Sequence, residues 1–447
     1  MSIITPITAE QPATQSNTTT TPSKKLETGS LTALVPYLVL SRATLGVQST
    51  DDRYASISTL AADLLTGSGG TAGYANSPGV NQRGANYATV HTPADATTLA
   101  QYLALSPGGD GTFIFATADQ LQLIAVALSA IDHEFDEDTT ATAHTTSFNN
   151  RAALTFDSPN AEDWLVIASV AISATDDTVQ SEWLVDLDSS DNELFGQETG
   201  NLDSESHVRT LARVYSLTAA SHTFTVQSRD DTSAANSYAS SRLMAIRLAS
   251  FTDAHHAWTQ TTTTSADVQT LTFTPPAEGD YLLIGSAVYT PQTAGDAGHV
   301  YLDVDGTTVP TGEADTWQGR TWGATDEAPM FTAAVVSLDA TEHDITLKGL
   351  YSGSGTIGRR ALVAIKLESV AVAPPTGNDR TALALLTQDA AVLTAAAVSN
   401  KPTYTATAAL LQGAAHLFAR ESPVQVILPP MRTRAAPSRQ RTRRIDG

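Results

Sequence analysis

The chain has 447 residues, which is long enough for two or three domains that each bury a hydrophobic core. It contains no cysteine, so disulfides, thiolate metal sites and a cysteine nucleophile are excluded. A formal net charge of -22 argues against nucleic acid as a partner of the body, and no apolar run reaches the roughly 18 residues of a membrane-spanning helix.

The N-terminal residues 1–30 are rich in Ser, Thr and Gln, with almost no large apolar residue after Ile4 and Ile7. Such a segment cannot offset the entropy of ordering by burying a core. We predict an extended, flexible arm.

Residues 31–131 show a mixed pattern that predicts an α/β attachment region. Helical spacing is found for one apolar set, Ile57, Leu60, Ala61 and Leu64. The segment Thr92-Pro93-Ala94-Asp95 resembles a capped helix start. Residues 123–131 fit a strand as well as a helix, and the sequence leaves both open.

Comparison of the chain with itself reveals a duplication. Residues 154–172 align without a gap on residues 271–289, an offset of 117, with 8 of 19 positions identical. Two further blocks match in the same order at offsets of 121 and 119: residues 214–227 with 335–348, and residues 243–251 with 362–370. A period near 119 residues is the size of a complete domain and too long for a solenoid repeat.

Each copy has the strand-and-turn rhythm of an antiparallel β-sandwich. Short segments rich in Val, Ile, Leu, Thr and aromatic residues are separated by clusters of Gly, Pro, Asp and Asn. Residues 164–167 and 281–284 are apolar without alternation, which predicts central strands covered on both faces. We predict a mainly β protein with two tandem sandwiches, at residues 139–251 and 256–371.

The C-terminal part differs in composition. Residues 376–429 are rich in Ala, Leu and Thr and predict a partly helical segment that ends in a short strand near Val424–Leu428. Residues 430–447 form a basic tail, which we predict to dock on an acidic surface of another protein or of a neighbouring subunit, with contact to nucleic acid as the second choice. Its six arginines are Arg432, Arg434, Arg439, Arg441, Arg443 and Arg444.

Signatures of catalysis are absent from the sequence. It has no G-x-S-x-G elbow, H-E-x-x-H helix, P-loop or strand-preceded G-x-G-x-x-G, and we predict no catalytic residue, cofactor or metal ligand. Three acidic or histidine groups could bind a cation. We interpret residues 132–138 as a solvated linker and the set Asp186, Asp188 and Asp191 as a polar turn. The pair His255-His256 lies on an extended segment, where adjacent side chains point to opposite sides.

Aromatic residues gather in the second copy among Gly, Thr and Asp. Trp317, Trp322 and Tyr351, together with Trp258, could stack on a sugar ring, because an aromatic face offers a large apolar area at low entropic cost. Packing in the core or between subunits is the alternative, and we prefer it.

The segments FTPPAEGDYLLIGSA, LDVDGT, VVSLDATEHDITLKG and ALVAIKLES, in this order, resemble jelly-roll-like sandwich modules of tailed-phage fibre, spike and decoration proteins. The resemblance covers about residues 140–370. It implies a non-enzymatic virion protein, assembled in the host cytoplasm, that forms homo-oligomers, with a trimer favoured. It also implies other virion proteins as partners and contact with host surface polysaccharide. The alternatives are a carbohydrate-binding module outside a virion and a glycan depolymerase.

Overall fold

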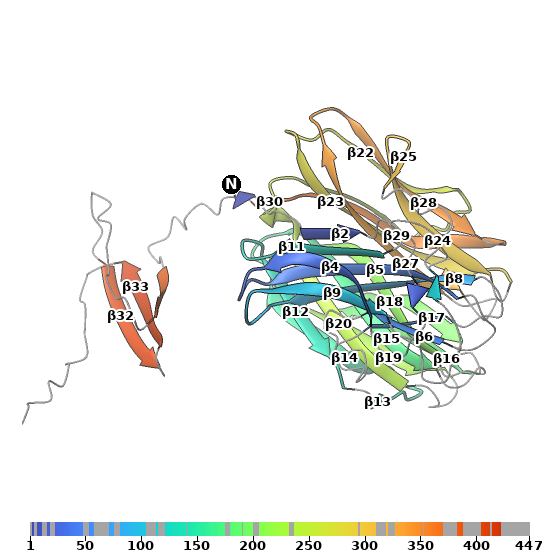
Figure 1. Ribbon diagram of the computed structural model, residues 1–447, viewed down its shortest axis with the longest axis horizontal. Coiled ribbons are helices and arrows are strands. Elements are labelled where there is room, and N and C mark those ends of the chain that lie inside the picture. Colours follow the sequence, from blue (N-terminus) through green and yellow to red (C-terminus); the bar gives the residue numbers. More distant parts are fainter. Residues whose placement is uncertain are drawn as a thin grey trace, which may run out of the picture. The chain divides into compact units, whose positions relative to one another are not determined.

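The computed structural model describes the following residues: 2–3, 7–10, 16–17, 23–47, 53–57, 71–75, 81–103, 113–114, 121–140, 142–174, 179–189, 191–199, 205–231, 237–293, 296–309, 319–320, 327–351, 353–369, 382–387, 404–411 and 414–421. The chain divides into two compact units, Met1–Val370 and Ala371–Gly447. Apart from one 3-10 turn, Leu248–Ser250, every described element is a β-strand (Figure 1). No helix in these ranges could cross a membrane.

The first predicted repeat is a sandwich of two antiparallel sheets. Its main strands, lettered B to I in chain order, are β12 (His133–Asp138), β14 (Asn149–Asp157), β15 (Glu162–Ala174), β16 (Gln180–Leu187), β17 (Asp191–Thr199), β18 (Glu205–Leu217), β19 (Ser221–Asp230) and β20 (Ser237–Arg247). One sheet has the order B-I-D-G and the other C-H-E-F, with β13 (Thr142–Ala143) paired to β20. This eight-stranded arrangement is a jelly roll.

The second predicted repeat has the same topology. Strands B to I are here β21 (Ala254–Thr259), β22 (Asp267–Phe273), β23 (Gly279–Pro291), β24 (Ala297–Val304), β25 (Thr307–Val309), β27 (Ala328–Leu338), β28 (His343–Tyr351) and β29 (Gly355–Lys366). The orders B-I-D-G and C-H-E-F recur, with β26 (Gly319–Arg320) beside β24. The prediction of two antiparallel sandwiches is therefore confirmed, although β12 and β21 each begin before the predicted boundary.

The N-terminal region is also a β-sandwich, so the prediction of a mixed α/β region at residues 31–131 was wrong. Residues 7–10 and 23–30, which were predicted to belong to a flexible arm, form strands of this sandwich. Its strands B to I are β2 (Ile7–Glu10), β4 (Ser23–Leu31), β5 (Tyr37–Val47), β6 (Arg53–Ile57), β7 (Thr71–Ala75), β8 (Asn81–His91), β9 (Thr97–Leu103) and β11 (Leu121–Ala127). β2, β11, β5 and β8 repeat the order B-I-D-G, while β4 pairs with β9 and β6 with β7. Three short strands complete this part: β1 (Ser2–Ile3), which pairs with β30 (Glu368–Ser369), and β3 (Ser16–Asn17) and β10 (Phe113–Ile114), which pair with each other.

The predicted helix start at residues 92–95 instead leads into strand β9. Leu99 is fully buried, and its backbone N–H donates to Thr28 Oγ1 on β4 at 2.9 Å. Pairing with β4 thus satisfies backbone groups that a helix would satisfy internally, and tertiary context overrides the capping signal. Of the predicted helical set 57–64, only Ile57 lies in the described residues, at the end of β6. The open choice for residues 123–131 is settled as strand up to Ala127.

Each of the two predicted sandwiches has its own hydrophobic core, and a third core joins them to the N-terminal sheet. On β15, Trp164 and Val166 face the core of their own sandwich, whereas Leu165 and Ile167 face the third core. This alternation explains the unbroken apolar run at residues 164–167, because both faces of the strand are covered. The same holds for residues 281–284 on β23.

The C-terminal unit contains a three-stranded antiparallel sheet, and its predicted helices were wrong. The order is β31 (Ala382–Thr387), β33 (Ala414–Glu421), β32 (Tyr404–Leu411). Apolar runs of Ala, Leu and Thr have no clear period, so they do not distinguish a strand from a helix. The predicted strand at 424–428 and the basic tail at 430–447 lie outside the described residues.

Candidate functional site

Two equivalent Asp–His pairs secure the same turn in the duplicated sandwiches. Asp305 follows β24 with a positive φ of 52°, a conformation that aspartate tolerates better than most residues. Its carboxylate accepts hydrogen bonds from the Asp344 backbone N–H at 2.9 Å and from His343 Nδ1 at 2.7 Å. In the first copy, Asp188 binds the Thr223 N–H and His222 Nδ1, each at 2.7 Å.

Electrostatics strengthens this arrangement. The hydrogen bond that His343 donates to Asp305, opposed by burial, raises the pKa of His343, and the same hydrogen bond lowers the pKa of Asp305. Both side chains are held by the turn and by each other, so the recurrence of histidine at these positions has a structural cause. The pairs fasten the E–F turn to the start of strand H.

The acidic segment 132–138 is strand β12 and its lead-in, where we had predicted a solvated linker. Its carboxylates are used in packing the strand: Asp136 Oδ2 accepts from the Ala153 N–H at 2.8 Å, and Glu137 lies 3.4 Å from Arg242 Nε. Asp132 accepts from Arg247 Nη1 at 2.6 Å. The segment is therefore an integral edge strand of the first duplicated sandwich.

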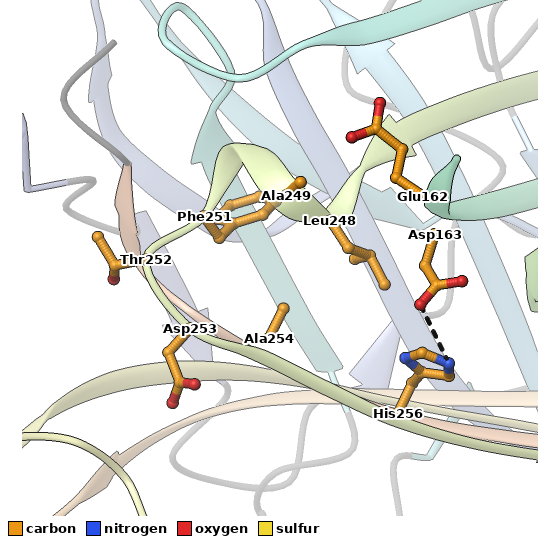
Figure 2. Close-up of a pocket in the computed structure, with 9 residues that line it drawn as sticks. All are labelled: Glu162, Asp163, Leu248, Ala249, Phe251, Thr252, Asp253, Ala254 and His256. Carbon is orange, nitrogen blue, oxygen red and sulfur yellow. Dashed lines mark ion pairs between the residues drawn. The ribbon is translucent and has the colours of Figure 1, made fainter. Parts of the chain in front are cut away.

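A pocket of about 440 Å³ opens where the first duplicated sandwich connects to the second (Figure 2). Its walls are the start of β15 and the connection from the 3-10 turn into β21: Glu162, Asp163, Leu248, Ala249, Phe251, Thr252, Asp253, Ala254 and His256. On one side, His256 Nε2 lies 3.8 Å from Asp163 Oδ2.

A second pocket of about 440 Å³ lies where the N-terminal sandwich connects to the first duplicated one. It is lined by Ile131, Asp132, His133, Glu134, Thr155, Phe156, Asp157, Pro159 and Trp164. Arg247 joins the walls of both pockets, because it donates to Asp132 in this one and to Glu162, at 2.8 Å, in the other. With three carboxylates lining each, these two acidic pockets suit basic groups better than anions.

The adjacent histidines point to opposite sides of β21, as their spacing predicts. His255 Nε2 lies 2.9 Å from Asp253 Oδ1, and its ring stacks on Phe273 with centroids 4.2 Å apart. His256 turns to Asp163 instead. Among the described residues, no group of three or more potential ligands is arranged to hold a metal ion.

The predicted aromatic group is only partly within the described residues. Tyr351 stacks on the buried ring of Tyr289 with centroids 5.8 Å apart, and its hydroxyl donates to the Ser265 carbonyl at 3.0 Å. Trp258 lies against the guanidinium of Arg213 at 4.8 Å, where the two duplicated sandwiches meet. Both rings are thus engaged in packing. Trp317, Trp322 and the six tail arginines lie outside the described residues.

Neither a protein-family model nor a curated protein matches this chain. Among solved structures, a protein from an archaeal virus, described by a triple jelly-roll fold and turret assembly, is similar at 10% identity over 78% of this chain and 84% of that chain, with a TM-score of 0.20. A protein of T=1 particles derived from infectious bursal virus is similar at 7% identity over 83% and 79%, with a TM-score of 0.22. A β-porphyranase from Bacteroides plebeius is similar at 10% identity over 52% and 38%, with a TM-score of 0.17. With scores this low, the assignment of the fold rests on the strand order alone.

Sequence reasoning missed both acidic pockets. Glu162 and Asp163 are ordinary turn residues in the sequence, and Arg247 closes a strand. The pockets form only because connections between sandwiches fold back on the C–D turn of the first copy, and no spacing along the chain encodes that contact.

Proposed function

We propose that the chain is a non-enzymatic structural protein of the virion of a tailed phage or phage-like particle. It serves there as a fibre, a spike or a capsid-attached decoration. The observation that supports this best is the tandem of jelly rolls joined by a shared core, since jelly rolls are recurrent building modules of viral capsids. The fold is also found in lectin domains, so the role must be tested directly.

The contacts of the histidine and arginine side chains support a structural role. His222 and His343 hold turns, and Arg247 ties connections between sandwiches. The basic tail, residues 430–447, is proposed to dock on acidic surfaces of other virion proteins or of further copies, because arginine forms bidentate pairs with carboxylates.

The decisive experiment is mass spectrometry of purified particles from the source organism, with detergent-washed and density-banded virions. We expect peptides from this chain at a stoichiometry comparable to other minor structural proteins. A truncated variant lacking residues 430–447 should be expressed and folded but depleted from particles. Absence of the full chain from clean particles would refute a virion role.

Contact with host surface polysaccharide is the finer part of the proposal. Trp317 and Trp322 lie in the connection between β25 and β27, residues 310–327, which is longer than the corresponding residues 200–204 of the first copy. A glycan array probed with the full chain and with the Trp317→Ala and Trp322→Ala variants tests it, with Tyr351→Phe as a control that keeps the ring stack. Equal signals from all variants would remove these tryptophans as glycan contacts.

A further inference from the structure

The three sandwiches present equivalent rows of side chains to the core that they share. In each B-I-D-G sheet, one residue from strand G, one from D and one from I stand side by side in register. The rows are Ala88–Leu40–Ile124, Ala212–Ile167–Met244 and Ala333–Ile284–Val363. All nine side chains belong to one buried cluster, which we call the central core.

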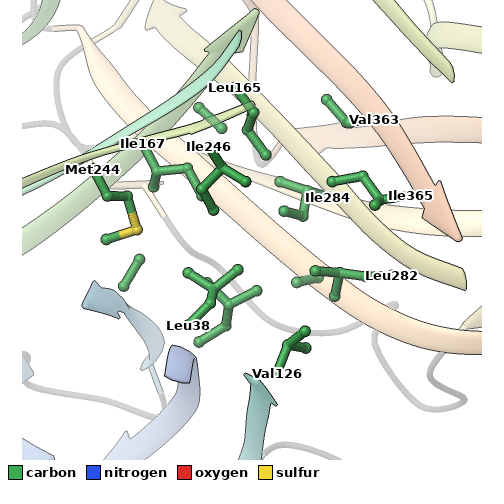
Figure 3. Close-up of a cluster of buried hydrophobic side chains, with 14 of the residues drawn as sticks. Leu38, Val126, Leu165, Ile167, Met244, Ile246, Leu282, Ile284, Val363 and Ile365 are labelled. Carbon is green, nitrogen blue, oxygen red and sulfur yellow. The ribbon is translucent and has the colours of Figure 1, made fainter. Parts of the chain in front are cut away.

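A second set of rows lies two residues along each D strand. It consists of Val90–Leu38–Val126, Val214–Leu165–Ile246 and Val335–Leu282–Ile365. Figure 3 shows Leu38, Leu165 and Leu282 in the same buried cluster, with Ile246 and Ile284 between Leu165 and the other two. Side chains two residues apart on a strand point to the same face of the sheet. In each of the three B-I-D-G sheets, the two rows therefore lie on the face that points into the central core.

Hydrogen bonds between sandwiches repeat with the same geometry. The N–H of Ala88, on strand G of the N-terminal sandwich, donates to Ser169 Oγ on strand D of the next sandwich at 3.1 Å. The N–H of Ala212, on the next strand G, donates to Ser286 Oγ on the following strand D at 3.0 Å. The contact between the N-terminal and first duplicated sandwiches therefore recurs between the first and second duplicated sandwiches.

These bonds also explain how an exposed edge is avoided. Strand G is the last strand of each B-I-D-G sheet, and an uncovered edge strand invites pairing with other chains. Here β18 lies beside both β8 and β27, and β27 lies beside β8, so the three G strands cover one another around the central core. In the N-terminal sandwich, Arg42 stands at the position of Ser169 and Ser286.

The sequence keeps a trace of this relation. Near its start, strand D carries an aromatic residue followed by three aliphatic ones in every sandwich, at residues 37–40, 164–167 and 281–284. Strand I keeps the pattern Leu-x-Ala-(Ile/Val)-x-Leu, at residues 123–128, 243–248 and 362–367. The N-terminal sandwich is thus a third, more divergent copy of the same unit.

We propose that one chain is a complete pseudo-three-fold ring of jelly rolls, and that its central core takes the place of a trimer interface. The building block is then the monomer, and the homotrimer suggested by the phage resemblance is unnecessary. The isolated chain needs no further copy to complete its central core, so we expect a monomer in dilute solution. This proposal concerns the isolated protein and does not depend on a virion role.

Native mass spectrometry of the full chain is the first test. We expect a single species at 46.9 kDa that does not change over a hundredfold dilution. A species at two or three times this mass that persists on dilution would overturn the proposal, whether or not the protein is later found in particles.

Hydrogen exchange of two matched variants is the second test, and it does not depend on oligomeric state. Leu165→Ala removes a fully buried side chain from the central core, and Leu243→Ala removes one from the first copy's own core. We expect Leu165→Ala to raise exchange at least about tenfold in β5 and β23 as well as in β15, and Leu243→Ala to act within residues 133–247. Confinement of both effects to residues 133–247 would overturn the proposal.

Discussion

The two duplicated sandwiches fill equivalent core positions with different side chains, and exchanging these side chains tests whether the positions are equivalent. Gly285 on β23 corresponds to Ala168 on β15 at the offset of 117. A Cβ on Gly285 would lie within 3.0 Å of a methyl of Leu347, a distance that real structures do not show. In the first copy, the residue in place of Leu347 is Val226, which is smaller. We therefore expect the shorter valine to leave room for the alanine methyl in the first copy.

The expected energies follow from these contacts. Gly285→Ala overpacks the second sandwich and should cost about 1–3 kcal/mol of unfolding free energy. Leu347→Val removes one methylene from a fully buried position and should cost about 1 kcal/mol. The double variant restores the Ala–Val pair of the first copy, so its cost should fall below the sum of the two single costs by about 1 kcal/mol or more.

The stability of the three variants is measured by urea unfolding, with hydrogen exchange of residues 279–291 as the probe of the second duplicated sandwich. This local probe is needed because a global unfolding transition of several sandwiches need not be two-state. The mirror pair in the first copy, Ala168→Gly and Val226→Leu, is the control and should couple with the same sign. Strict additivity of Gly285→Ala and Leu347→Val would refute the reasoning, as would a neutral Gly285→Ala.

Three further outcomes follow from individual contacts. His343→Ala should lower stability by about 1 kcal/mol near pH 5.5, since the pair with Asp305 is partly exposed. Because the pKa of His343 is raised, the stabilisation by this pair is full below about pH 6.5 and is lost as the pH rises through the folded pKa of His343. Because the pKa of Asp305 is lowered, the stabilisation is also lost in acid, as the Asp305 carboxylate becomes protonated. A pH-independent difference between pH 3 and 9 would contradict this. Ser286→Ala leaves the buried Ala212 N–H without its acceptor and should cost about 1–3 kcal/mol in urea unfolding, whereas Ser286→Thr should retain most of the stability. Arg247→Met should cost about 1.5 kcal/mol in thermal unfolding and open residues 131–134 to exchange, because it removes the bridge between the two acidic pockets.

The candidate site was less accessible to sequence reasoning than the fold. The spacing of His255 and His256 correctly predicted opposite orientations, since neighbouring residues on a strand alternate in direction. The structural use of His222 and His343 could be anticipated from their recurrence, but their aspartate partners could not, because the E–F turn and strand H lie more than 30 residues apart. The predicted roles of Trp317, Trp322 and the arginine tail remain predictions.

The sequence by itself determined that two similar strand-built domains follow one another. Strand and turn signals are local, and the duplicated sequence repeats them at a nearly constant offset. It also marked residues 164–167 and 281–284 as doubly covered, because the chain must be apolar on both faces where it has two neighbours.

Only the tertiary structure decided what covers the second face. The N-terminal region has the same B-I-D-G strand order, but its local signals at residues 92–95 point to a helix, and pairing of β9 with β4 overrides them. The central core likewise joins Leu38, Leu165 and Leu282, which are more than 100 residues apart. Contacts of this kind are specified by the match of three surfaces in space, which no single stretch of the chain contains.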